Sequence, residues 1–119
     1  MKITPFEKAC KKLGINPTLL PGVEGLPELT AKQVIAGYKL GMIHKATNGN
    51  WVADFNDYRQ YKYTAWLEYS PSLRRFVYSV TYYTFAYTYF GARFWFADGD
   101  TAVKFTKQNI ALINDLHQE

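Results

Sequence analysis

Apolar residues recur at helical spacing at the start of the chain. Four of them follow at intervals that place them on one helix face: Phe6, Ala9, Cys10 and Leu13. Thr4 precedes Pro5 and stands three residues before Glu7, which is the arrangement of an N-cap with a capping box. Gly14 then ends the segment. The pattern predicts an amphipathic helix that runs up to Leu13.

A segment rich in proline and glycine separates this helix from a second one. Residues 15–29 hold three prolines and two glycines, so they cannot continue a helix. Their apolar residues predict an ordered loop that packs across the domain. The second helix is predicted to begin at Thr30, with Gln33 at the capping-box position, and to end in a turn at residues 47–50. It is apolar on two sides, which indicates a central, buried helix.

The second half of the chain alternates with a period of two, the pattern of β-strands. Three strands are predicted, over residues 61–69, 76–83 and 89–97. The face toward the helices is expected to hold Phe76, Tyr78, Val80, Phe90, Phe94 and Phe96. The opposite face is expected to expose Tyr83, Tyr89, Arg93 and Trp95, together with Lys62 and Trp66. One face of the sheet would then be free to contact another molecule.

A final helix is predicted after residues 98–101, running to about His117, with Asn109 in the middle of its apolar stripe. The element order is therefore α-α-β-β-β-α, and short connections favour an antiparallel meander. The predicted fold is α+β, a three-stranded antiparallel β-meander packed against three helices. A length of 119 residues predicts one domain that covers residues 1–119.

Aromatic residues and charges are both distributed unevenly. Of the 21 aromatic residues, 18 lie between Trp51 and Phe96. This part of the chain is therefore unusually rich in aromatic side chains. The net charge is +4, divided into +6 over residues 1–93 and −2 over residues 94–119. A basic body permits attraction to nucleic acid or to another acidic partner, and it is equally consistent with a merely solvated basic surface.

Cysteine usage and hydropathy indicate the compartment. Cys10 is the only cysteine, so the chain can form neither an intramolecular disulfide nor a cysteine-based zinc site. The first residues lack the apolar stretch of a signal peptide, and the longest uncharged run, residues 76–92, is too polar for a membrane helix. A cytoplasmic protein is predicted, with no membrane partner.

Oxygen-bearing side chains gather in two places. Asp54, Asn56 and Asp57 could suggest a site for a hard cation, but their loop lacks the glycine and the distal glutamate of an EF-hand. We interpret them as turn-forming residues. Asp98 and Asp100 are interpreted as residues that cap the N-terminus of the last helix.

No set of residues has the spacing of a catalytic centre. His44 and His117 each lie near a predicted helix C-terminus, where a protonated imidazole is favourable. Neither has a serine, cysteine or carboxylate at a recognisable catalytic spacing, and Cys10 is predicted to be a small core residue. We expect no metal, no cofactor and no small-molecule substrate, and we predict that the chain is not an enzyme.

Residues 49–57, Gly-Asn-Trp-Val-Ala-Asp-Phe-Asn-Asp, are followed by Gln-Tyr-Lys-Tyr at residues 60–63 and by Trp66. This stretch resembles a family of small uncharacterised proteins of Bacteroidetes and their phages or mobile elements. Its members typically carry Gly-Trp-x-Pro-Asp-Trp-Asn-Asp, then Gln-Tyr-Lys-Tyr and an aromatic hairpin. Ala53 stands where proline is usual in the family, and Phe55 replaces tryptophan.

The resemblance extends over most of the chain. Later matches are Gly-Ala-Arg-Phe-Trp-Phe at residues 91–96 and Lys-Gln at residues 107–108, and residues 14–27 resemble the linker of some members. Asn109 lies at or beside a usual phenylalanine. The resemblance implies a phage-linked origin and supplies no mechanism.

The expected aromatic and basic face of the sheet is the main functional indication. Its predicted binding residues are Lys62, Trp66, Tyr83, Tyr89, Arg93 and Trp95. Rings beside cations can stack on unpaired bases, and tyrosine, tryptophan and arginine also anchor protein interfaces. Internal packing of the rings is a further possibility. We predict a non-enzymatic binding module of phage or mobile-element type that prefers a protein partner or self-association. The alternative is a single-stranded nucleic-acid-binding accessory protein.

Overall fold

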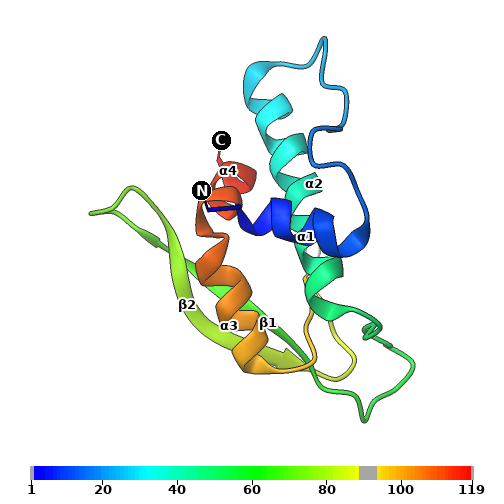
Figure 1. Cartoon of the computed structure of the whole chain (residues 1–119). Coiled ribbons are helices and arrows are strands. Elements are labelled where there is room, and N and C mark those ends of the chain that lie inside the picture. The colour runs from blue at the N-terminus through cyan, green and yellow to red at the C-terminus, as the bar shows by residue number, and fades with distance from the viewer. Residues whose placement is uncertain (1, 89–93, 119) are drawn as a thin grey trace. The chain divides into compact units, whose positions relative to one another are not determined.

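The computed structural model describes residues 2–88 and 94–118. Within these residues the chain forms four helices and a two-stranded antiparallel sheet (Figure 1). In chain order the elements are α1 (Pro5–Leu13), α2 (Glu28–Asn48), β1 (Lys62–Ser70), β2 (Arg75–Thr84), α3 (Gly99–Gln108) and α4 (Ile110–His117). The predicted α+β class is confirmed, whereas the predicted numbers of strands and helices are not.

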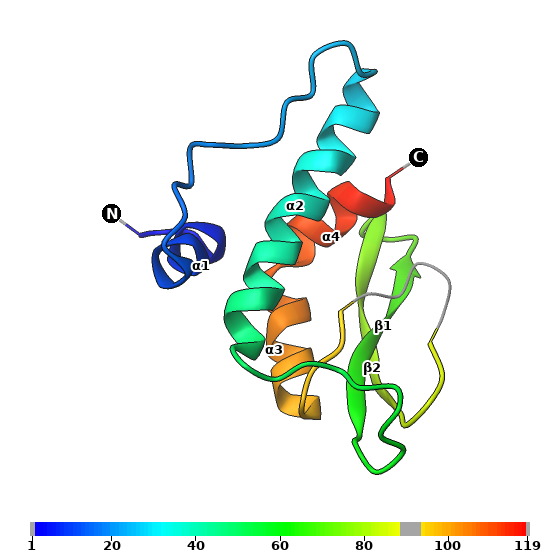
Figure 2. The ribbon, with the colours of Figure 1, turned by 90° about the vertical axis from the view of Figure 1, so that its right-hand side faces the viewer.

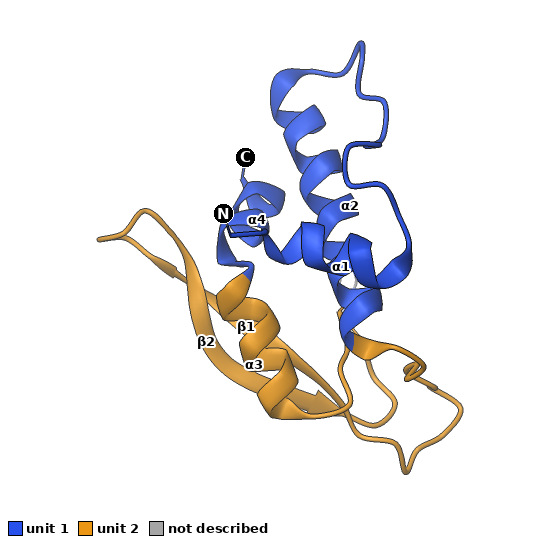
Figure 3. Cartoon of the chain, viewed as in Figure 1, with its two compact units in different colours: residues 1–47, 109–119 blue, residues 48–108 orange. Residues whose placement is uncertain are grey.

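The chain divides into two compact units (Figure 3). The first unit combines residues 1–47 with residues 109–119, and the second unit is the continuous stretch 48–108. The first unit is helical, and the second holds the sheet and α3. None of the described helices combines the length and the apolar character needed to cross a membrane.

In the first unit, α1 begins as the sequence predicts. The amide of Glu7 donates to Thr4 Oγ1 (3.1 Å) and the amide of Thr4 donates to Glu7 Oε1 (3.0 Å), which completes the capping box. Gly14 ends the helix with φ at +71°, a left-handed conformation that glycine adopts without strain. The ring of Phe6 packs edge-on against Tyr38 at 6.1 Å, which joins α1 to α2.

The start of α2 differs from the prediction. The helix begins at Glu28, so Thr30 lies inside its first turn and does not cap it. The side chain of Gln33, expected in a capping box, instead donates to the carbonyl oxygen of Gln118. Lys32 and Asp115 form an ion pair at 3.4 Å that joins α2 to α4. The ribbon shows α4 lying beside α2 (Figure 2).

The β1–β2 hairpin in the second unit contains a bulge that the alternation pattern does not reveal. Trp66 pairs with Val80 and the next residue, Leu67, pairs with Tyr78, so Ser79 is an extra residue on β2. A one-residue insertion reverses the side on which all following side chains point. Val80 therefore lies on the face opposite to Tyr78, and the prediction that both face the helices is wrong.

Helix α3 covers one face of the hairpin, called here the inner face. A Cβ atom at Gly99 would lie 3.4 Å from Thr81 Cγ2 and 3.7 Å from Tyr63 Cδ1, so the start of α3 packs directly on the strands. At the other end of α3, Lys107 Nζ lies 5.2 Å from the ring centroid of Tyr78. The opposite side of the hairpin is called the outer face.

The predicted third strand is not present in the described part of the chain. Residues 89–93 lie outside the described residues, and of residues 94–97 only Phe96 pairs, through two backbone hydrogen bonds with Tyr63 (2.9 and 2.7 Å). The ring of Phe96 packs against Phe105 of α3 at 4.8 Å, and Phe94 contacts the same ring at 5.6 Å. These contacts direct the segment onto α3 rather than along the sheet.

The predicted C-terminal helix is two helices, α3 and α4, because the chain turns at Asn109. This residue has φ −114° and ψ 21°, outside the helical range, and its side chain is buried. Asparagine is a poor helix former, since its amide competes for backbone hydrogen bonds. The break coincides with the boundary between the two units.

Asp98 caps α3, as the sequence predicts, and this generates a first testable expectation. Its carboxylate accepts a hydrogen bond from the amide of Thr101 (2.8 Å), and that bond lowers the pKa of Asp98. Asp98→Ala should reduce the free energy of unfolding by about 1 kcal/mol, whereas Asp98→Asn should retain most of the cap. All three tryptophans lie in the second unit, so their fluorescence during urea unfolding reports the change.

The same cap should depend on pH in a defined direction. Because the pKa of Asp98 is lower in the folded state, its ionic contribution is complete above the pKa of an unfolded aspartate, about 3.9. It is lost as the pH falls through the folded value. The difference in stability between the wild type and Asp98→Asn should therefore be constant at neutral pH and change only in acid. An equal loss in Asp98→Asn and Asp98→Ala at neutral pH would contradict the cap.

Candidate functional site

The side chain of Lys62 organises the open end of the hairpin, where β1 begins and β2 ends. Lys62 is completely buried. Its Nζ donates to the carbonyl oxygens of Asp57 (3.2 Å), Gln60 (2.9 Å) and Phe85 (2.8 Å). An ammonium group has three N–H donors, so all of them are used. The three carbonyls belong to the segments on both sides of the hairpin, which Lys62 thereby joins.

Two aromatic rings pack in the region of this ammonium group. The Phe55 ring centroid lies 5.0 Å from Lys62 Nζ, a cation–π contact. Phe55 also packs edge-on against Trp95 at 6.1 Å, and the Trp95 carbonyl accepts a hydrogen bond from Asn48 Nδ2 (2.8 Å). Trp95 and Lys62 are therefore held beneath the same loop, residues 51–61.

This loop is internally bonded, as the sequence interpretation expects. Asp54 Oδ1 accepts from the amide of Asn56 (2.9 Å), and Asp57 Oδ1 accepts from the amide of Arg59 (3.0 Å). These are the turn-forming bonds of Asx residues. The Arg59 amide is the main cause of a lowered pKa for Asp57. Gln60 closes the loop, because its side chain donates to the Val52 carbonyl (2.9 Å) and accepts from the Asp54 amide (2.6 Å).

Four aromatic rings form a cluster on the inner face at the open end, called here the tyrosine cluster: Tyr61, Tyr63, Tyr83 and Phe85. Tyr61 stacks on Tyr83 with centroids 5.5 Å apart and an angle of 18° between the planes. Phe85 meets Tyr61 edge-on at 4.3 Å. Tyr83, which belongs to β2, is 53% exposed, so the cluster reaches the surface.

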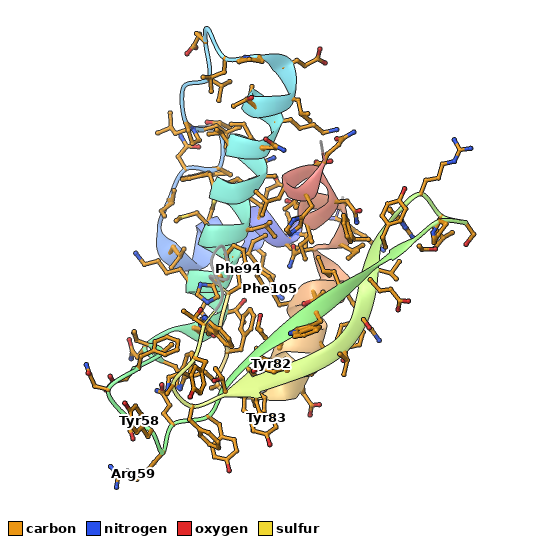
Figure 4. The ribbon with its side chains drawn as sticks, turned by 180° about the vertical axis from the view of Figure 1, so that it is seen from behind. Tyr58, Arg59, Tyr82, Tyr83, Phe94 and Phe105 are labelled. Atoms are coloured by element: carbon orange, nitrogen blue, oxygen red, sulfur yellow. The ribbon has the colours of Figure 1, made fainter. Side chains whose placement is uncertain are left out.

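Further exposed aromatic residues lie close to the tyrosine cluster in the sequence. Tyr58 is 71% exposed on the loop and Tyr87 is 79% exposed after β2. Arg59 extends away from the ribbon beside Tyr58, and Tyr83 lies at the same end of the second unit (Figure 4). We call these residues together with the tyrosine cluster the tyrosine surface.

The outer face presents a separate apolar strip. Trp66 is 48% exposed, packs against Tyr82 at 5.6 Å and stands directly across from the exposed Val80. Cross-strand neighbours on one face form a continuous patch. Because the bulge at Ser79 reverses the faces, this strip consists of residues that the sequence divided between two sides.

The structure does not bring the six predicted binding residues onto one face. Lys62 and Trp95 are buried, so the expectation that they are exposed is wrong. The reasons are the carbonyl contacts of Lys62 and the packing of Trp95 on Phe55. Trp66 and Tyr83 are exposed, but they lie on the outer and inner faces respectively. Tyr89 and Arg93 lie outside the described residues.

The described residues contain no group of three histidine, cysteine, aspartate or glutamate side chains that could hold a metal ion. His44 and His117 belong to the first unit, whereas Asp54 and Asp57 belong to the second. Cys10 is free and completely buried in α1, as the sequence predicts.

Comparison with known proteins yields no relative. No protein-family model matches the sequence. No curated protein is detectably similar to it. No solved structure matches the fold. The resemblance to small proteins of Bacteroidetes and their phages therefore stays a prediction from the sequence.

The role assigned to Lys62 can be tested by removing its charge while keeping most of its length. Lys62→Met leaves three partly buried carbonyl oxygens without their donor, so the free energy of unfolding should fall by about 2–3 kcal/mol. Lys104→Met, on the exposed side of α3, is the matched control and should change it by less than about 0.5 kcal/mol. Urea unfolding followed by tryptophan fluorescence measures both. Equal midpoints for the two variants would contradict the role.

Proposed function

We propose that the chain is a non-enzymatic binding module that recognises a protein partner through the tyrosine surface. The observation that carries this proposal is the convergence of exposed tyrosines on a backbone that Lys62 fixes from below. Tyrosine and arginine are the residues that most often supply binding energy at protein interfaces. They combine a large contact area with few rotatable bonds.

The fixed backbone favours binding, because the conformational entropy of the loop is lost when the protein folds and not when it binds. A loop that becomes ordered only on binding loses conformational entropy at that step, which weakens the complex. Here Gln60 closes loop 51–61 at both ends, and Lys62 ties the loop to Phe85. Tyr61 and Tyr83 are stacked before any partner arrives.

The chemistry of the tyrosine surface favours a protein over single-stranded nucleic acid. Stacked bases need cations nearby to hold the phosphates. The donors of Lys62 are all bonded to carbonyl oxygens, and Arg59 lies 3.4 Å from the carboxylate of Asp57. Asp54 and Asp57 would repel phosphates at this end. The single-stranded nucleic-acid alternative therefore has the weaker support.

The remaining parts of the proposal come from the sequence. The absence of enzymatic activity is proposed because no catalytic spacing accompanies His44 or His117. A phage or mobile-element origin rests on the resemblance of residues 49–63, and the cytoplasm is the expected location. Self-association is one form that the protein partner can take.

Site-specific photo-crosslinking tests the proposal. p-Benzoylphenylalanine at Tyr83, with the full chain expressed in its native host, should give a discrete crosslinked adduct with one protein. Tyr61→Ala in the same background should weaken binding about tenfold or more, because an anchor of this kind contributes about 2 kcal/mol. The yield of adduct should fall accordingly.

Tyr69 provides the matched control, because it is a half-exposed tyrosine of the same hairpin that lies away from the tyrosine surface. The same photo-crosslinker at Tyr69 should give no discrete adduct. An adduct of twice the chain mass, also formed by the purified protein, would identify the partner as a second copy. Equal labelling from both positions, or none from Tyr83, would refute the proposal.

A further inference from the structure

The charges of the second unit are separated along the hairpin. Four of its carboxylates lie toward the open end, in loop 51–61 and at the start of α3: Asp54, Asp57, Asp98 and Asp100. Four of its cations lie toward the other end, in the β1–β2 turn, at the start of β2 and on the later turns of α3: Arg74, Arg75, Lys104 and Lys107. Glu68 on β1, Arg59 in the loop and the buried Lys62 at the open end are the exceptions among the described residues.

The turn between the strands is the most basic and least compensated part of this unit. From Tyr69 to Ala97 the sequence contains three arginines and no aspartate, glutamate or lysine. Arg74 and Arg75 are both exposed, and in the described part of the chain neither forms a salt bridge. Helix capping explains Lys107, which lies in the last turn of α3, but it does not explain two adjacent arginines in a turn.

The turn is also presented as a projecting, ordered tip. The hairpin continues past the end of α3 (Figure 1). Ser70 Oγ accepts a hydrogen bond from the amide of Leu73 (3.3 Å) and lies 3.2 Å from Ser72 Oγ. Arg74 has φ at +54°, a left-handed conformation that is uncommon for arginine and fixes the direction of the chain. Leu73 is exposed between Ser72 and Arg74.

We infer that this tip, Leu73 with Arg74 and Arg75, is a contact site for the backbone of duplex DNA. The two guanidinium groups pair with phosphates of adjacent nucleotides, and Leu73 packs against the sugars at the edge of a groove. A two-stranded β-ribbon has the width of a structure that DNA grooves accept. The inference concerns a surface separate from the tyrosine surface and does not depend on it.

Duplex rather than single-stranded DNA is favoured by the chemistry of the tip. A duplex carries one charge per about 1.7 Å of axis, so closely spaced arginines meet several phosphates at once. Recognition of a single strand relies on rings that stack on bases. The nearest rings, Tyr69 and Phe76, already pack edge-on against each other at 5.4 Å.

The test is a titration of a short fluorescein-labelled DNA duplex of mixed sequence, followed by anisotropy at several salt concentrations. Binding should be strongest at low salt and fall steeply as salt rises. The double variant Arg74→Asn and Arg75→Ser should lower the slope of log affinity against log salt by about 1.8, or about 0.9 for each phosphate. Asparagine is chosen at position 74 because it tolerates a positive φ.

Two further variants separate the tip from general charge effects. Arg59→Ser removes an exposed arginine at the open end and should leave duplex affinity unchanged. Leu73→Ser should lower duplex affinity without changing the salt slope, because it removes an apolar contact and no charge. No binding to the duplex at low salt would overturn the inference. So would equal affinity for the unpaired strand, or an equal loss in Arg59→Ser.

Discussion

The second unit depends on one buried cation. Moving an ammonium group out of water costs several kcal/mol unless its hydrogen bonds are replaced. Lys62 replaces all three with backbone carbonyls, from Asp57 and Gln60 before β1 and from Phe85 after β2. A two-stranded hairpin alone is at best marginally stable in water. The Lys62 contacts close its open end and α3 covers its inner face, so a small sheet becomes a fixed frame.

The bulge at Ser79 determines which side chains lie on each face of the hairpin. Without it, Val80 and Tyr82 would share the inner face with Tyr78 and face α3. With it, they join Trp66 on the outer face, and Tyr83 is brought to the inner face beside Tyr63. The aromatic residues are consequently split between the outer strip and the tyrosine surface. A single inserted residue thus determines that Tyr83 joins the inner face and Tyr82 the outer face, the reverse of what an uninterrupted alternation would give.

Three local features were predictable from the sequence, whereas the capping box expected at Thr30 and the nonlocal features were not. The capping box at Thr4, the glycine at position 14 and the Asp98 cap depend on neighbours within four residues, and all three are found. The burial of Lys62 depends on a carbonyl 23 residues away, and period-two alternation alone marks it as a surface lysine. The bulge leaves no mark in the alternation, since serine suits either side of a strand. Asn109 in the apolar stripe was the one visible sign of the break between α3 and α4.

The two ends of the hairpin therefore offer different chemistry on one rigid support. Carboxylates accompany the rings at the open end, and their charge disfavours phosphates there. The tip has arginines with no neighbouring carboxylate except Glu68, and its nearest rings, Tyr69 and Phe76, pack edge-on against each other. Because the two sites share no residue, occupation of one end does not have to reshape the other. The proposed protein and DNA contacts are consequently compatible in a single molecule, and the variants at each end are expected to act independently because the sites share no residue.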